Sequence, residues 1–311
     1  MPEQIDVPVS TVEATYKGRD VEGIIDLYFY RKIGFRLAQL FARLKMTPAG
    51  VTILGGFFGI AAGHLYYYRD LPLNMLGMAL HVIANALDNA DGQLARLLGQ
   101  NSRIGRLIDG VVDQVIWTSI YVHLAFRYVS EGGSWGVWLL AIAAGLSHGL
   151  QAAAADYCRN GYLYFVKGRS RTNFDSSCAL RQDYRRLSWR TATWKKLLLV
   201  MYANITRQQE TLSPGLKQLH ERVERDFPHE IPGWLQSRYR TFARPTLKWW
   251  GLLMTNTRML ILFLLFIMGK PVWFFWIVLT LFNALLIYLV FQQRESSKSL
   301  LELFEPRHQT V

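Results

Sequence analysis

Four aspartates lie close together in an otherwise apolar part of the chain: Asp88, Asp91, Asp109 and Asp113. The first two are three positions apart and the last two are four positions apart, so on helices each pair projects from a single face. Ionisable groups at membrane depth are costly and usually mark a functional site with a partner. Hard divalent cations prefer carboxylate oxygens as ligands. Two such pairs on consecutive helices can therefore converge on one shared cation.

The aspartates occupy the end of one long apolar segment and the start of the next, at about residues 73–98 and 105–128. These segments reach the ~20 residues that a bilayer-spanning helix needs. Further segments of this kind lie at about 50–68, 135–157, 249–268 and 271–291. We therefore predict an all-α integral membrane protein with six transmembrane helices.

An amphipathic stretch precedes the first span. Residues 21–45 mix aliphatic and aromatic side chains with Lys and Arg, which predicts a helix lying at the cytoplasmic membrane interface. A helix packed on a protein partner is the alternative. Thr47 and Pro48 then predict a helix start, with Thr47 as N-cap and Pro48 at the first helical position.

Composition supports the membrane interpretation. The chain has 311 residues, of which 51% are hydrophobic, and a formal net charge of +12. A soluble nucleic-acid binder would also be basic, but it would not collect its apolar residues into spanning runs. The basic loops are expected to be cytoplasmic, which places both termini and the aspartates on the inner side of an inner or cytoplasmic membrane. We find no signal-peptide pattern at the start of the chain.

The segment between the fourth and fifth spans differs from the rest, because it has no spanning run and is rich in Lys and Arg. Its short amphipathic stretches predict helices that rest on the membrane or on the protein core. An ordinary charged surface and a specific role with anionic lipid both remain open. Cys158 and Cys178, the only cysteines, are expected to be free thiols. The predicted division of the chain is a leader with its interfacial helix at 1–48, catalytic spans at 49–157, a basic cytoplasmic insertion at 158–248, two spans at 249–292 and a tail at 293–311.

The aspartates belong to a longer pattern of fixed residues. With its gaps, the pattern is D-x2-D-G-x2-A-R-x8-G-x3-D-x3-D, formed by Asp88, Asp91, Gly92, Ala95, Arg96, Gly105, Asp109 and Asp113. At these residues the chain resembles the CDP-alcohol phosphatidyltransferases, whose signature it matches at every fixed position and gap. The resemblance covers roughly residues 47–160.

The resemblance implies a role for each motif residue. Asp88, Asp91 and Asp109 match the metal-binding aspartates, with Mg²⁺ or Mn²⁺ as the expected ion. Asp113 matches the aspartate taken as the base that activates the acceptor hydroxyl. The remaining motif positions are expected to hold the CDP moiety: Gly92, Ala95, Arg96 and Gly105. An ion-pair network between the aspartates and nearby arginines is the purely structural alternative.

The resemblance implies transfer of a substituted phosphate from a CDP-linked donor to an acceptor alcohol, with release of CMP, in phospholipid biosynthesis. The donor is either CDP-diacylglycerol or a CDP-linked headgroup. A soluble polyol phosphate is an alternative acceptor, and a cation transporter or channel is an alternative from another class. Membrane lipids are expected partners, nucleic acid is not, and a homodimer is expected by family analogy.

A few other polar residues are weaker candidates. Asp156, Arg159 and Asn160 lie at the predicted cytoplasmic end of the fourth span, where they would line an acceptor pocket or simply face the interface. His148 and Gln151 lie deeper in the same segment. For these two we expect a hydrogen bond between helices rather than catalysis.

Overall fold

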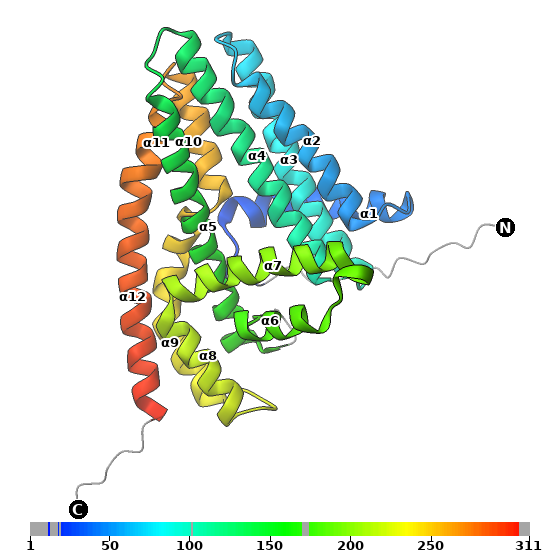
Figure 1. The fold of residues 1–311 in the computed structure, drawn as a ribbon, viewed down its shortest axis with the longest axis vertical. Helices are drawn as coiled ribbons and strands as arrows, with labels where there is room; N and C mark the ends of the chain where they lie inside the picture. The colour runs from blue at the N-terminus through cyan, green and yellow to red at the C-terminus, as the bar shows by residue number, and fades with distance from the viewer. Residues whose placement is uncertain (1–11, 13–17, 19, 101, 170–173, 305–311) are drawn as a thin grey trace, which may run out of the picture. The chain divides into compact units, whose positions relative to one another are not determined.

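The computed structural model describes residues 12, 18, 20–100, 102–169 and 174–304, and in these ranges the chain is helical with no strand (Figure 1). The chain divides into two compact units. The first unit comprises Met1–Ser147 and Met259–Leu279, and the second comprises His148–Arg258 and Thr280–Val311. The all-helical prediction is therefore confirmed for the described residues, and each unit is treated separately below.

The first unit contains the helices that carry the motif. The motif residues lie on α3 (Leu71–Leu97) and α4 (Arg103–Ser130). The unit also contains η2 (Asp26–Tyr30), α1 (Arg31–Arg43), α2 (Pro48–Leu65), the first residues of α5 (Val137–Lys167), most of α10 (Thr255–Ile267) and α11 (Trp273–Ile277). Polar side chains fix three of the helix starts. The Thr47 hydroxyl accepts a hydrogen bond from the Gly50 N–H, and Asp70 and Ser102 cap α3 and α4 in the same way. The helix start predicted at Thr47 and Pro48 is confirmed.

Glycines on one face of α2 let it approach its neighbours closely. α2 packs on both α3 and α4. A Cβ atom at Gly59 would lie 2.6 Å from the Ile116 side chain, and one at Gly63 would lie 3.1 Å from the backbone nitrogen of Ile120. Contacts this short leave no room for a side chain. The glycines therefore set the spacing between α2 and α4, the helix that carries Asp109 and Asp113.

The leader helix α1 packs on α3 through its apolar face. Ala38, Phe41 and Ala42 are buried in a cluster with Leu87, Ala90 and Leu94. The two helices are also close at Gly34, where an added Cβ would lie 3.2 Å from the backbone of Asn89 and Ala90. One face of the predicted amphipathic helix is thus occupied by the protein itself. The predicted location of this helix at the membrane interface stays a prediction.

The second unit is built around most of α5 (Val137–Lys167) and the long helices α9 (Gly233–Leu252) and α12 (Asn283–Leu301). The helices between them are α6 (Ser177–Arg186), α7 (Trp189–Leu212) and α8 (Pro214–Asp226), and the short elements η4 (Val278–Phe282) and η5 (Glu302–Phe304) flank α12. α6 packs on α7, and α12 packs on α8 and α9. The predicted basic insertion is therefore helical over most of its described residues.

Among the residues that the structure describes, four helical segments are long and apolar enough to cross a membrane: Pro48–Leu65, Val137–Lys167, Gly233–Ile267 and Trp273–Phe304. The chain is accordingly a multi-pass membrane protein. α3 and α4 have 27 and 28 residues, which is sufficient length, but their aspartates, arginines and buried amides lower their apolar content.

Two helix boundaries differ from those expected from the sequence. α5 continues to Lys167, ten residues beyond the predicted end of the fourth span, because its last turns bury aromatic side chains. Phe165, for example, stacks on Tyr239 of α9 with ring centroids 4.5 Å apart. The predicted fifth span is interrupted between α9 and α10, where the Arg258 guanidinium donates hydrogen bonds to the Leu253 carbonyl oxygen.

Gln151 forms the hydrogen bonds between helices that were expected of it. In the second unit its amide nitrogen donates to the Asn283 side-chain oxygen at 2.7 Å, and its oxygen accepts from Arg258 at 2.9 Å. Amides and a guanidinium paired in this way are stable in an apolar environment. Cys158 and Cys178 are both free, as expected.

Candidate metal centre

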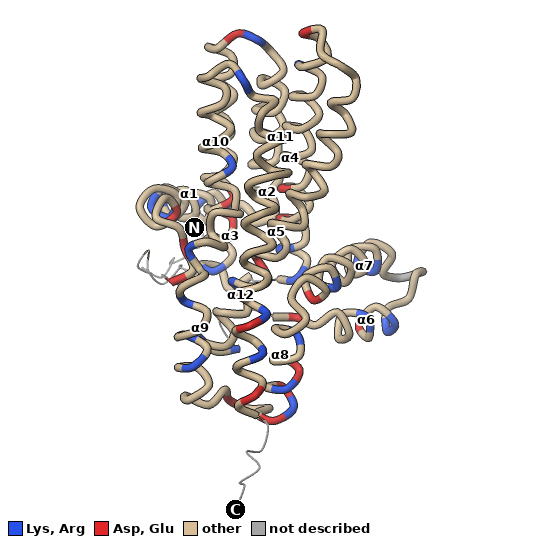
Figure 2. The backbone as a smooth tube through the Cα atoms, turned by 90° about the vertical axis from the view of Figure 1, so that its left-hand side faces the viewer, with Lys and Arg blue, Asp and Glu red and all other residues tan. Residues whose placement is uncertain are grey.

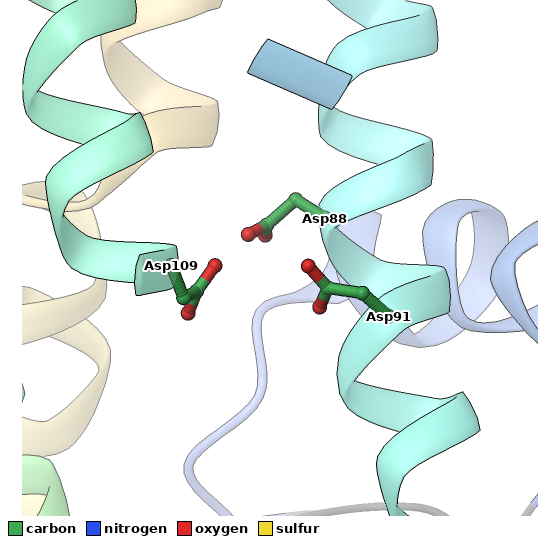
Figure 3. Close-up of side chains that lie close together, drawn as sticks. All are labelled: Asp88, Asp91 and Asp109. Carbon is green, nitrogen blue, oxygen red and sulfur yellow. The ribbon is translucent and has the colours of Figure 1, made fainter. Parts of the chain in front are cut away.

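Three of the four motif aspartates converge in the first unit (Figure 3). Asp88 and Asp91 project from α3 toward Asp109 on α4, and one carboxylate oxygen from each lies within 4.8 Å of the others. Asp91 is buried, whereas the other two are partly exposed. Asp88 and Asp91 therefore project from one face of α3, as predicted, and this face is directed toward Asp109 on α4.

This arrangement concentrates negative charge at one place. The three carboxylates repel one another, and Asp113 adds a fourth negative charge that acts on Asp109. One Asp109 oxygen is buried and has no hydrogen-bond partner among the described residues. Oxygen ligands in this number and at this separation fit a hard divalent cation, which would relieve the repulsion. The donor set therefore fits the ion expected from the sequence.

Thr52 supports the cluster from a third helix. Its hydroxyl on α2 donates a short hydrogen bond to the Asp91 carboxylate, and the same oxygen lies 3.0 Å from the Pro48 carbonyl oxygen. Such a contact orients a metal ligand from behind. We did not predict this role for Thr52, because the two residues are far apart in sequence and no local pattern connects them.

Asp113 follows Asp109 on α4 by four residues and is not one of the three converging ligands. Its side chain is partly exposed. A carboxylate that lies beside a metal centre without being a ligand is free to accept a proton from a substrate. Its role as a base stays a prediction.

The residues expected to hold the CDP moiety lie on the same two helices. A Cβ at Gly92 would meet only the Arg96 guanidinium, at 3.6 Å, so helix packing does not require glycine there. The Nε and one terminal nitrogen of Arg96 are buried without a hydrogen-bond partner among the described residues. Unpaired buried donors are expensive, and an anionic ligand would satisfy them.

Gly105 and Ala95 have structural surroundings that do not by themselves indicate a nucleotide. The Gly105 N–H donates to the Ser102 hydroxyl at 2.9 Å, and a Cβ there would lie 3.1 Å from that oxygen, so Gly105 belongs to the helix cap of α4. Ala95 is partly exposed on α3. Contact of either residue with a nucleotide stays a prediction.

Asp156 and Arg159 lie on α5 in the second unit and are partly exposed. Asp156 accepts a hydrogen bond from the Asn160 amide at 2.9 Å, one helical turn further on. This pair is local to one helix. The acceptor pocket expected from these residues stays a prediction.

Comparison with known proteins supports the interpretation of the motif. Residues 45–161 match the family described as CDP-alcohol phosphatidyltransferase. The chain is similar to a bifunctional IPC transferase and DIPP synthase of Thermococcus kodakarensis, with 27% identity over 45% of this chain and 32% of that protein. It is 26% identical to an archaetidylinositol phosphate synthase of Pyrococcus horikoshii, over 41% of this chain and 65% of that protein.

A phosphatidylinositol phosphate synthase of Streptomyces avermitilis is 30% identical, over 33% of this chain and 42% of that protein. The matched regions thus span less than two thirds of these three relatives. The matched family region includes α2, α3, α4 and most of α5, and it contains all three converging aspartates.

Proposed function

Because this chain belongs to the CDP-alcohol phosphatidyltransferase family through residues 45–161, we propose that it transfers a substituted phosphate group from a CDP-linked donor to an acceptor alcohol. The products are the new phosphodiester and CMP. The convergence of Asp88, Asp91 and Asp109 within 4.8 Å carries this proposal. Three carboxylates alone would repel the negatively charged pyrophosphate of the donor. Divalent cations bound between the carboxylates and the phosphate oxygens would make the interaction favourable.

The chain's own residues divide the chemistry between them. Asp88, Asp91 and Asp109 would hold Mg²⁺ or Mn²⁺, which would supply positive charge against the phosphate oxygens and the departing nucleotide phosphate. Asp113 removes the proton from the acceptor hydroxyl. The acceptor oxygen then forms a bond to the phosphorus distal to cytidine, and the bond from that phosphorus to the CMP oxygen breaks.

Arg96 and Gly92 contribute to binding the donor. The buried, unpartnered nitrogens of Arg96 donate to donor phosphate oxygens, and the absent side chain of Gly92 leaves space beside them. Ala95 and Gly105 complete the nucleotide site from the same two helices.

A panel of alcohols identifies the acceptor. Two relatives are named as synthases of inositol phosphate lipids, so an inositol phosphate is the first acceptor to test with CDP-diacylglycerol as donor. Lipid-linked and soluble alcohols follow in the same panel. Asp156 and Arg159 are the residues that we propose to contact the acceptor.

We also propose the complete membrane arrangement. α3 and α4 join the apolar segments as spanning helices, giving six spans with both termini and the aspartates on the cytoplasmic side. The lengths of α3 and α4 and the positive charge of the connecting segments support this topology. A homodimer follows by family analogy alone.

A cation transporter remains the alternative from another class, since intramembrane carboxylates serve transport as well. It requires neither Gly92 nor the unpartnered donors of Arg96. Nucleotide-dependent chemistry therefore distinguishes the two functions.

The deciding experiment measures acceptor-dependent CMP release by the purified full-length protein with Mg²⁺ or Mn²⁺ and a panel of CDP-linked donors. We expect CMP from at least one donor–acceptor pair and none from Asp113→Asn with the same pair. If no pair yields CMP while reconstituted vesicles accumulate the metal, transport replaces the proposed reaction.

A further inference from the structure

α7 in the second unit has one face packed against protein. Ala203, Thr206 and Glu210 are buried on this face. The Glu210 carboxylate accepts hydrogen bonds from the Ser177 N–H at 2.8 Å and from its hydroxyl at 2.7 Å, and it forms an ion pair with Lys217 of α8 at 3.1 Å. These contacts fix the rotation of α7 about its own axis, so the direction of its opposite face is also fixed.

The opposite face of α7 is apolar and uncovered. Trp194, Leu197, Met201 and Ile205 follow one another at intervals of three and four residues, which places them on one side of the helix. Trp194 is 76% exposed, and the other three are exposed by 38–43%. A continuous apolar stripe of this kind is uncommon on a surface that faces water and indicates an interaction site.

Basic side chains border this stripe. Lys195 and Arg207 on α7 are exposed, as are Arg181, Arg185 and Arg186 on the neighbouring α6. Figure 2 marks Lys and Arg positions along the backbone of both helices. Glu210, the acidic residue of α7, is buried and already paired. The exposed charge around the apolar stripe is therefore positive. This combination of an apolar stripe with Lys and Arg at its margins is that of a helix lying on an anionic bilayer.

The direction of α7 within its own unit agrees with such a surface. In Figures 1 and 2, α7 runs crosswise to α12, at the level of the middle of that helix. α12 belongs to an apolar segment that can cross a membrane, and its sequence changes from apolar to charged after Phe291. A helix that lies across a spanning helix near such a change runs along the membrane surface.

We propose that α7 lies on the surface of the bilayer, with its apolar stripe inserted among acyl chains and its basic margins contacting anionic lipid headgroups. The exposed Trp189 and Trp194 suit this location, because tryptophan concentrates at the boundary between headgroups and hydrocarbon. This proposal concerns the second unit and does not depend on the catalytic function proposed above.

The test places a fluorescent, polarity-sensitive label on α7 in the full-length protein reconstituted in nanodiscs. Met201→Cys in a Cys178→Ser background carries the label on the stripe. The matched control is the wild-type chain labelled at Cys178, which is exposed on α6, since the other cysteine, Cys158, is buried. Neither position is packed in the interior, so labelling leaves the fold intact.

We expect the label at position 201 to shift to shorter wavelength and to be quenched by nitroxide-bearing lipids, and the label at Cys178 to do neither. The shift should be larger in discs of phosphatidylcholine with phosphatidylglycerol than in phosphatidylcholine alone. Lys195→Gln combined with Arg207→Gln should reduce that difference, since the arginines of α6 remain.

Water-like emission at position 201 in both kinds of disc would overturn the proposal. A blue shift at position 201 that nitroxide lipids do not quench would also overturn it, because a protein partner or a second copy of the chain would then cover α7. Equal shifts with and without anionic lipid would contradict the role assigned to the basic margins.

Discussion

The Thr52 hydroxyl on α2 donates a hydrogen bond to the Asp91 carboxylate on α3. This contact connects the first spanning helix to the acidic cluster and holds Asp91 in one orientation. Thr52→Val removes the hydroxyl at nearly constant volume. We expect it to weaken Mn²⁺ binding about tenfold to a hundredfold, as loss of such supporting contacts does elsewhere.

Titration of the purified protein with Mn²⁺, followed by electron paramagnetic resonance, measures this change. Thr52→Ser keeps the hydroxyl and serves as the control. Equal affinities for the valine and serine variants would show that the hydrogen bond does not support the site.

Substitutions of the four aspartates should fall into two groups, those that abolish metal binding and those that abolish turnover alone. Asp91→Asn removes a ligand charge and is expected to abolish both metal binding and CMP release. Asp113→Asn is expected to keep metal binding close to that of the wild type while CMP release is lost, because this side chain is not one of the three converging ligands. Measuring metal binding and turnover on the same preparations checks the separation. Loss of metal from Asp113→Asn would make that residue a ligand instead.

A bound cation should stabilise the protein by joining α3 to α4. Binding to the folded state alone adds about 2.7 kcal/mol at roughly 100 times the dissociation constant. Asp109→Asn removes carboxylate repulsion, so the melting temperature of the variant should exceed that of the wild type in chelator. The variant also lacks one metal ligand, so it should melt below the wild type in saturating Mg²⁺. Thermal unfolding in detergent, with and without the ion, provides both comparisons. The same order of melting temperatures in both conditions would contradict a metal site.

The glycine face of α2 should be intolerant of larger residues. Gly63→Val would place a side chain against the backbone of Ile120, and overpacking of this kind costs ~1–3 kcal/mol. We expect lower thermal stability and a loss of turnover, since α2 and α4 would separate at the helix that carries Asp109. Gly145→Ala is the control, because nothing lies within 4 Å of a Cβ at that position. Comparable losses in both variants would argue against a role for helix spacing.

The contact between α6 and α7 should depend on pH. Burial opposes ionisation of Glu210, but hydrogen bonds from Ser177 and the charge of Lys217 outweigh it, so the pKa of Glu210 is lowered from its usual value. Ionised Glu210 therefore stabilises the folded state at pH values above its ordinary pKa of 4.5. This stabilisation is lost as the pH falls through the pKa of the folded state. Hydrogen exchange of the first amides of α6 should accelerate there, and Glu210→Gln should remove the pH dependence. An unchanged pH response in the variant would assign it to another group.

Local sequence patterns predicted the parts of the structure that depend on neighbouring residues. Thr47 and Pro48 start a helix because capping is a matter of a few adjacent residues. The face shared by Asp88 and Asp91 follows from helical periodicity, and the motif spacing indicated that Asp109 would join them.

Contacts between residues far apart in the sequence could not be predicted from local patterns. The hydrogen bond of Thr52 to Asp91 depends on how closely α2 and α3 pack, and the pairing of Glu210 with Ser177 depends on the rotation of α7. The helix break at Leu253 and Met254 accompanies hydrogen bonds from the Arg258 guanidinium to the Leu253 carbonyl oxygen. Periodicity describes one helix at a time and contains none of this information.

Gly34 has a consequence for exchanging parts between related proteins. The backbone of α1 rests directly on that of α3 at Asn89 and Ala90, the two residues between Asp88 and Asp91. No flexible side chain separates the two helices there, so a differently shaped leader would shift the very turn that carries two of the cluster's carboxylates. The leader and the motif helix therefore form one structural unit. A chimaera should exchange them together, with its junction placed outside both.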